Sequence, residues 1–209
     1  MAIPKNSRGG SPARDLRTGI PVWLRKGEAR VVHTSLDESI KVDIAVVGAG
    51  VSGALMVDAL LRTGQTIAVL DRRGAVKGSS PASTALLQFE IDQPLTHLMK
   101  KIGRERAVRA YWRSAMAVDC LRARISDLQL RCSFRERHTA YLPGDVLGVK
   151  DLRVEAHERC RVGLRSRFIG RDELRTRTTI EAPGAIWSSG SAELDPAALT
   201  AGLWRTGHR

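Results

Sequence analysis

Apolar residues dominate two short stretches in the first third of the chain, and a glycine-rich turn follows the first of them. Val42–Val47 is apolar and β-branched, which is typical of a buried strand. After the turn, Ala54–Leu61 has the composition of an apolar helix, which we expect to close at Gly64. Thr66–Leu70 is again apolar and β-branched. The pattern therefore predicts a strand, a turn, a helix and a second strand, which is a βαβ unit.

The turn carries glycines at the three positions of a dinucleotide-binding fingerprint. Gly48 can adopt the backbone angles of a tight turn, a side chain at Gly50 would collide with a pyrophosphate, and the bare Gly53 lets helix and strand pack closely. Free N–H groups at the positive end of the helix then bind the pyrophosphate. Asp71, 23 residues after Gly48, can accept both ribose hydroxyls. An ordinary strand–glycine–helix turn is the alternative, and the complete order of elements favours the nucleotide.

A basic loop follows Asp71 and leads into a stretch of small residues, Ala82–Gln88. This stretch has the chemistry of a helix start, because Ser80 can cap a helix and Pro81 suits the first helical position. Small hydroxylated residues at a helix N-terminus let an anion or a polar ring approach the backbone. We therefore expect a second cofactor contact here, and a plain connecting loop is the alternative.

The second half of the chain changes its periodicity several times. Arg104–Leu128 repeats apolar residues at helical spacing, which predicts a long amphipathic helix with one stripe in the core. Asp195 followed by Pro196 predicts the start of a last helix. Other expected helices are Pro94–Ile102, Val149–Val162 and Asp172–Arg175, and expected strands are Cys132–Phe134, His138–Leu142 and Ala185–Ser188. The mixture indicates an α+β region after the βαβ unit.

Composition limits the partners. The 209 residues carry a net charge of +12, but acidic residues interleave with the basic ones, and 4% aromatics provide no stacking surface, so we expect no nucleic acid. No apolar run reaches the length of a membrane span. Cys120, Cys132 and Cys160 show no CxxC spacing and the five histidines are dispersed, so we expect reduced thiols, a cytoplasmic location and no metal site.

The fingerprint and its sequel resemble the FAD-dependent oxidoreductases of the D-amino-acid oxidase superfamily, which includes glycine and sarcosine oxidases. That family extends the turn as GxGxxGxxxAxxLxxxG, and Leu60 and Gly64 fit this pattern whereas Val57 stands where alanine is usual. Gly78–Leu87 is similar to the family's second flavin-contacting segment. DLRTGIPVWL, near the start, and Gly190–Pro196 are also similar to members of the group.

The resemblance implies FAD as the cofactor and the oxidation of a C–N bond in an amine or D-amino acid by hydride transfer to the flavin. It leaves the electron acceptor and any catalytic residue unassigned. The cofactor-binding residues expected from the fingerprint and the resemblance are Gly48, Ala49, Gly50, Val51, Ser52, Gly53, Asp71, Arg72, Arg73, Ser79, Ser80, Ala82, Ser83 and Thr84.

Two other functions remain open at this point. Arg72 and Arg73 could favour a 2′-phosphate and hence an NAD(P)-binding oxidoreductase, although a nicotinamide domain usually has a shorter loop after its second strand. A non-catalytic, basic binding module could also retain the nucleotide fold as a scaffold.

Members of the family are about twice as long as this chain, and their sheet is completed by later strands. The resemblance therefore implies an N-terminal fragment of the α/β class: a Rossmann-like FAD-binding βαβ unit with an incomplete sheet, followed by an α+β region of the substrate domain. We expect an arm and linker at residues 1–40, the FAD-binding part with its long helix at 41–128, and a partial substrate or cap region at 129–209.

Overall fold

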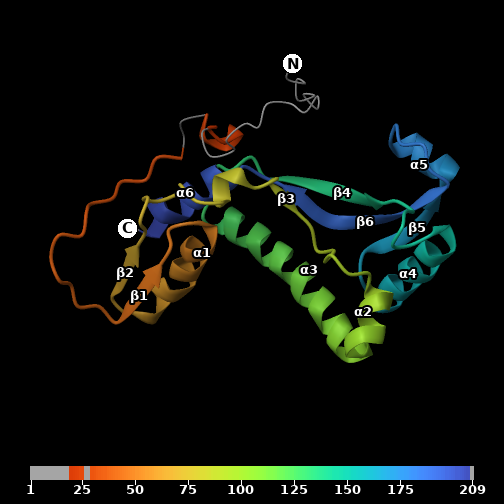
Figure 1. The fold of residues 1–209 in the computed structure, drawn as a ribbon, viewed down its shortest axis with the longest axis horizontal. Coiled ribbons are helices and arrows are strands. Elements are labelled where there is room, and N and C mark those ends of the chain that lie inside the picture. The colour runs from red at the N-terminus through yellow and green to blue at the C-terminus, as the bar shows by residue number, and fades with distance from the viewer. Residues whose placement is uncertain (1–18, 26–28, 208–209) are drawn as a thin grey trace, which may run out of the picture.

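The computed structural model describes residues 19–25 and 29–207, and Figure 1 shows two lobes connected by a long helix. The expected arm at residues 1–40 therefore lies partly outside the described residues. The first, or βαβ, lobe contains β1 (Ile44–Val47), α1 (Val51–Leu60), β2 (Ile67–Leu70) and α6 (Pro196–Gly207). The second, or sheet, lobe contains β3 (Leu86–Leu87), α2 (Leu95–Ile102), β4 (Arg135–Tyr141), α4 (Val149–Arg161), β5 (Ser166–Gly170), α5 (Arg171–Arg177) and β6 (Gly184–Glu193). The connecting helix is α3 (Arg104–Asp127).

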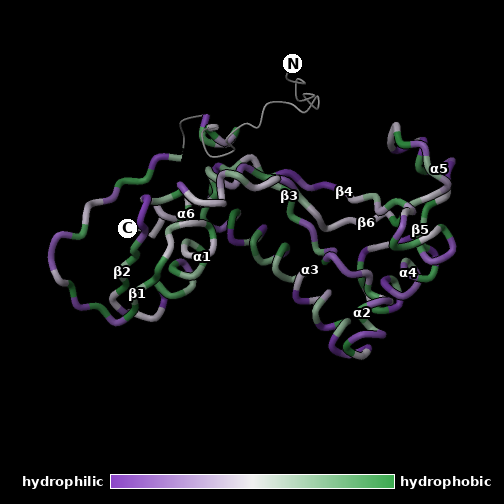
Figure 2. The backbone as a smooth tube through the Cα atoms, viewed as in Figure 1, coloured by the Kyte–Doolittle hydropathy of each residue, from purple (hydrophilic) through white to green (hydrophobic). Residues whose placement is uncertain are grey.

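The βαβ lobe has the predicted strand–helix–strand order. β1 and β2 pair in parallel, from Ile44 opposite Ile67 to Val47 opposite Leu70. Helix α1 begins at Val51, three residues before the predicted start, because Gly50 already serves as its N-cap. A 3₁₀ turn, η2 (Leu61–Thr63), follows and ends at Gly64 in the left-handed region, with φ of +73°. Figure 2 shows that β1, α1 and β2 are the most continuously hydrophobic part of the chain.

Helix α6 packs on α1 although the two are far apart in sequence. Asp195 Oδ1 accepts the N–H groups of Ala197 and Ala198, both at 3.0 Å, which confirms the predicted cap. Leu199, Leu203 and Trp204 then join the core cluster that also contains residues of α1. The C-terminal helix therefore packs with the βαβ lobe, whereas the expected division placed it in a cap region.

The sheet lobe is built on β6, the longest strand of the structure's described part. β4 pairs antiparallel with one edge of β6, while β5 and β3 pair with it at different heights, Ser166 opposite Ser188 and Leu86 opposite Glu193. Strand β5 has no counterpart in the predicted elements, because its five residues carry little apolar periodicity.

One predicted strand is absent. Cys132–Phe134 forms a turn after α3, in which Ser133 has a φ of +52° and the Cys132 carbonyl accepts the Asp195 N–H at 2.7 Å. The extended strand β4 begins only at Arg135. A residue in the left-handed region interrupts the pleat, which is why the apolar composition of this segment did not produce a strand.

The predicted long helix is confirmed as α3, and it links the lobes. Tyr111, Val118 and Ile125 are buried along one stripe, as the periodicity predicts. Towards the βαβ lobe, Arg124 makes a bidentate ion pair with Asp58 of α1, with N–O distances of 2.6 and 2.7 Å. This geometry fixes the direction of α3 relative to α1.

Candidate functional site

The glycine turn has the close contacts that the fingerprint predicts. Gly48 lies at φ +111°, and its N–H donates to the Leu70 carbonyl at 2.8 Å, which extends the pairing of β1 and β2 into the turn. A Cβ on Gly53 would lie 1.9 Å from the Gly48 carbonyl oxygen. A side chain at this position would force the helix off the strand.

The first turn of α1 offers amide groups to an anion. The N–H groups of Ser52 and Gly53 have no helical carbonyl to donate to, and the helix dipole adds positive potential at this end. The Val51 N–H differs, because it donates to Ser80 Oγ at 2.9 Å. The structure therefore leaves the amides of Ser52 and Gly53 as donors for a pyrophosphate, whereas that of Val51 is already used within the protein.

Asp71 lies at the end of β2, next to the glycine turn. Its Oδ2 accepts the Ala49 N–H at 2.9 Å and its Oδ1 accepts the Arg73 N–H at 2.8 Å. These hydrogen bonds, chiefly that from Ala49, hold the pKa of Asp71 below its ordinary value. Because an ionised carboxylate has about four acceptor positions, each oxygen can still accept a hydroxyl group. Asp71 therefore orders the turn and remains an acceptor for a ribose.

The Ala49 carbonyl connects the turn to the rest of the lobe. It accepts the Trp204 Nε1–H of α6 and the Val76 N–H, both at 3.2 Å. Beside it, Ala49, Asp71 and Trp204 line a cavity of about 380 Å³ that residues 31–34 also line. This volume lies within the range of about 300–1,000 Å³ that is usual for ligand sites.

The second predicted contact segment has a different structure from the one expected. Ser80–Ala82 forms a single 3₁₀ turn, η3, and the chain then extends into β3, so the expected helix start, with Ser80 as the cap and Pro81 as the first residue, is only this turn. The buried Ser80 hydroxyl caps α1 in place of a helix of its own. The local sequence could not reveal this, because the partner amide lies 29 residues earlier.

The other predicted residues of this segment spread over two sides of the lobe. Ser79, Ala82 and Ser83 are exposed. Thr84 lines a second cavity, of about 280 Å³, together with Trp23, Glu193 and the start of β4. The exposed Arg72 and Arg73 stay beside Asp71. The structure thus groups Gly48–Gly53, Asp71 and Ser80 closely and places Thr84 at a separate cavity.

Three contacts at the site involve residues that the sequence did not single out for it. Trp204 contacts the turn from α6, Trp23 donates its indole N–H to the Ser83 carbonyl at 3.0 Å, and the His33 ring lies against Gly74. Each lies at least forty residues from its partner along the chain, so periodicity carries no signal for these contacts. Within residues 19–25 and 29–207, no group of three or more His, Cys, Asp or Glu residues is arranged to hold a metal ion.

The protein belongs to the family of FAD-dependent oxidoreductases (DAO), whose family model matches residues 43–209. FAD is the cofactor of this family, which decides between FAD and NAD(P) in favour of FAD. The observed turn suits that cofactor: Gly53 has no room for a side chain, two first-turn amides have no acceptor within the helix, and an ionised Asp71 follows β2.

Solved structures share this fold. The L-amino acid deaminase from Proteus vulgaris superposes with a TM-score of 0.65 at 18% identity, covering 85% of this chain and 45% of that chain. The L-proline dehydrogenase from P. horikoshii gives 0.62 at 17% identity, covering 80% and 42%. The glycine oxidase from Geobacillus kaustophilus gives 0.55 at 20% identity, covering 80% and 44%.

The chain therefore spans less than half the length of each of these structures. No curated protein sequence matches it. Among the described residues, no helix is both long enough and apolar enough to cross a membrane.

Proposed function

We propose that this chain provides the nucleotide-binding part of an FAD-dependent enzyme that oxidises a C–N bond of an amine or amino acid. The observation that carries the proposal is the ordered glycine turn, in which Asp71 holds the Ala49 amide beside the free first-turn amides of α1. The fold neighbours named as L-amino acid deaminase, L-proline dehydrogenase and glycine oxidase support an amino-acid or amine substrate.

In this proposal, the amides of Ser52 and Gly53 bind the pyrophosphate and Asp71 accepts the adenosine ribose hydroxyls. Gly48 and Gly50 keep the turn open for this contact, while Ser80 holds α1 in place through the Val51 amide. Thr84, Ser83, Ser79, Ala82 and Arg72 shape the surface on which the rest of the cofactor lies. When bound, the flavin supplies the acceptor for the hydrogen and electron pair that leave the C–N bond.

We further propose that polypeptide beyond these 209 residues completes the sheet of the βαβ lobe. The support is that β1 and β2 form a sheet of only two strands and that Val47 is 84% exposed. Parallel strands are normally covered on both faces and paired on both sides. This chain covers only 45% of the first of these relatives of known structure, which agrees with a longer functional unit.

The experiment is to measure flavin content and flavin reduction in the natural full-length protein. Gly50→Val adds a side chain whose Cβ would lie 3.0 Å from Ser80 Oγ. Asp71→Ala removes the carboxylate that accepts the ribose hydroxyls. We expect each variant to lose FAD affinity by at least about tenfold, the effect of a lost hydrogen bond to a charged group. Asp37→Ala, an exposed carboxylate on the N-terminal segment, is the matched control and should bind normally.

Unchanged flavin content in both variants would contradict the assigned site. Anaerobic addition of amino acids and amines should bleach the visible band of the bound flavin. Retained FAD with no bleaching by any of these substrates would overturn the proposed C–N oxidation while leaving the cofactor site intact.

A further inference from the structure

A segment that precedes the family region lines part of the cavity beside Asp71. The family match begins at residue 43, yet Val31–Thr34 form one wall of the cavity of about 380 Å³. Figure 1 shows residues 29–43, which follow η1 (Val22–Leu24) along the chain, looping around the outer side of β2. The opposite wall consists of Ala49, Asp71 and residues of α1 and β2. The cavity therefore has one wall from the family fold and one wall from this segment.

The segment contacts the lobe on its N-terminal side. Trp23 donates its indole N–H to the Ser83 carbonyl at 3.0 Å. The Arg30 carbonyl accepts a hydrogen bond from Arg205 Nη2 of α6 at 3.2 Å. Ala29 and Val31 pack against the core cluster of the βαβ lobe. These contacts place residues 31–34 next to the cavity in a defined position.

His33 is the polar side chain of this wall that lies nearest to the loop after Asp71. A Cβ on Gly74 would be 2.9 Å from both Cε1 and Nε2 of the His33 ring, so the ring rests directly on that glycine. Its Nδ1 lies 3.2 Å from the Val31 carbonyl oxygen, and because a carbonyl only accepts, Nδ1 carries the proton in this contact. The other ring nitrogen, Nε2, lies against Gly74, which also lines the cavity.

The lining matches an aromatic, polar-edged group attached to a ribose. Ala75, Val69 and Trp204 provide apolar surface, while His33, Thr34 and Asp71 provide polar groups. Asp71 is the residue to which the proposed function assigns the adenosine ribose. An adenine attached to that ribose would lie between Asp71 and the segment.

We propose that residues 31–34 form the outer wall of the adenosine half of the FAD site, with His33 contacting the adenosine. This inference rests on the proposed FAD binding and extends it to residues outside the family region. It predicts that changes in the segment weaken binding of the adenosine part of the cofactor and not of the flavin.

The test is the equilibrium binding of FAD and of ADP to the natural full-length protein by titration calorimetry. ADP carries the adenosine and pyrophosphate without the flavin. His33→Ala, alone and combined with Thr34→Ala, should weaken both ligands about threefold to tenfold, the effect of one or two lost contacts. Leu36→Ala, also on the segment but absent from the cavity wall and 56% exposed, should leave both affinities unchanged.

The side chains of His33 and Thr34 are both exposed, so the thermal unfolding temperatures of the variants should match that of the wild type. A change in ligand affinity then does not result from unfolding. As a second readout, ADP should slow tryptic cleavage after Arg30 relative to cleavage elsewhere in the chain. Wild-type affinities in the double variant, or no protection by ADP, would overturn the role of the segment alone. Absence of FAD and ADP binding in the wild type would overturn the proposed function as well.

Discussion

The two lobes are held together by different kinds of interaction. In the βαβ lobe, backbone groups and glycines set the geometry, and the sheet has two strands with Val47 84% exposed. In the sheet lobe, buried charged side chains join the elements: Glu155 and Arg159 of α4 are 0% and 1% exposed. The βαβ lobe is therefore ordered by backbone contacts that need bare glycines, whereas the sheet lobe is ordered by buried ion pairs, in which Glu90 Oε2 and Arg159 Nη1 have no hydrogen-bond partner.

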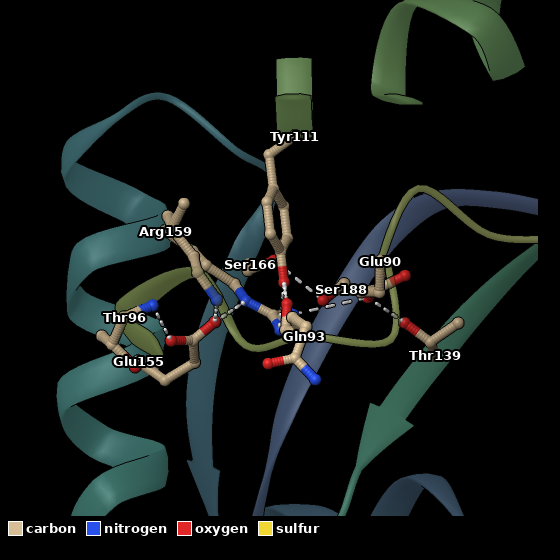
Figure 3. Close-up of polar contacts among 10 residues, drawn as sticks. Glu90, Gln93, Thr96, Tyr111, Thr139, Glu155, Arg159, Ser166 and Ser188 are labelled. Atoms are coloured by element: carbon tan, nitrogen blue, oxygen red, sulfur yellow. Dashed lines mark hydrogen bonds and ion pairs between the residues drawn. The ribbon is translucent and has the colours of Figure 1, made fainter. Parts of the chain in front are cut away.

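Figure 3 shows how the buried charges are used. Glu155 accepts the N–H groups of Leu95 and Thr96 at 2.7 and 2.8 Å, which caps α2, and it accepts Arg159 Nε at 2.7 Å. The Tyr111 hydroxyl of α3 lies 3.4 Å from Arg159 Nη2. One ion pair therefore holds α2, α3 and α4 together.

The same cluster reaches the sheet through Glu90. Its Oε1 accepts the Thr139 hydroxyl of β4 at 2.7 Å and lies 3.8 Å from Arg159 Nη1. Burial raises the pKa of Tyr111 well above its ordinary value, so this hydroxyl stays protonated and donates to the Gln93 carbonyl at 2.7 Å. The cluster is thus a polar support that runs from helices to sheet.

The largest predicted effect comes from removing the arginine of this cluster. Arg159→Met leaves Glu155 charged and buried without its partner, and we expect a loss of about 3–5 kcal/mol in the free energy of unfolding. Urea denaturation followed by circular dichroism measures it. Arg109→Met, from an ion pair whose two side chains are 55% and 89% exposed, should change stability by no more than about 0.5 kcal/mol. Equal effects of the two substitutions would contradict the supporting role of the cluster.

A smaller loss, with a defined pH dependence, is expected for Glu155→Gln. Burial alone would raise the pKa of Glu155, but the hydrogen bond from Thr96 and the charge of Arg159 outweigh it, so the pKa is lowered. A lowered pKa means that the carboxylate stabilises the fold above its unfolded-state pKa of about 4.3 and that this contribution is lost as pH falls. We expect a cost of about 1.5–3 kcal/mol at neutral pH, from the loss of charge-assisted hydrogen bonds.

The stability difference between Glu155→Gln and wild type should therefore shrink as the pH is lowered through the acidic range. Denaturation curves recorded at neutral and acidic pH give this difference directly. Glu105→Gln, at a side chain 89% exposed, supplies the reference. A difference that stays constant with pH would show that Glu155 stabilises the fold through its shape rather than its charge.

In the βαβ lobe, Gly53→Ala should cost about 1–3 kcal/mol, the usual penalty for forcing atoms into a packed site. The added Cβ would lie 1.9 Å from the Gly48 carbonyl, so α1 must move away from β1. We also expect loss of FAD binding, because the first-turn amides move with the helix. Gly144→Ala, with open space at its Cβ, is the control for both measurements. Normal FAD affinity in Gly53→Ala would contradict the assigned packing.

The smallest effect is expected for Val47→Thr in the 209-residue chain. Because Val47 is 84% exposed, the free energy of unfolding should change by no more than about 0.5 kcal/mol. In a longer protein with a completed sheet, the same hydroxyl would be buried and the cost should rise to about 1–3 kcal/mol. An equally small effect in both forms would argue against a covered face at β1.

The sequence predicted the local features of the fold well and its long-range contacts poorly. The βαβ order, the helix α3 and the cap at Asp195 depend on residues close in sequence, and all are observed. Ser80 was expected to cap a helix beginning at Pro81, yet its hydroxyl accepts the Val51 amide of α1 instead. Glu155 and Arg159 are charged residues that sequence patterns assign to the surface, and only the packing of α4 on α2 and the sheet buries them.

The central place of β6 also has a consequence for how the protein forms during synthesis. Strands β3, β4 and β5 each pair with β6, which is the last of the four to leave the ribosome. Until residues 184–193 emerge, the strand with which β3, β4 and β5 pair is missing. Their unpaired edges then stay available to other chains. The sheet lobe should therefore assemble late and abruptly, and truncation or a ribosomal pause before residue 184 should release aggregation-prone nascent chains.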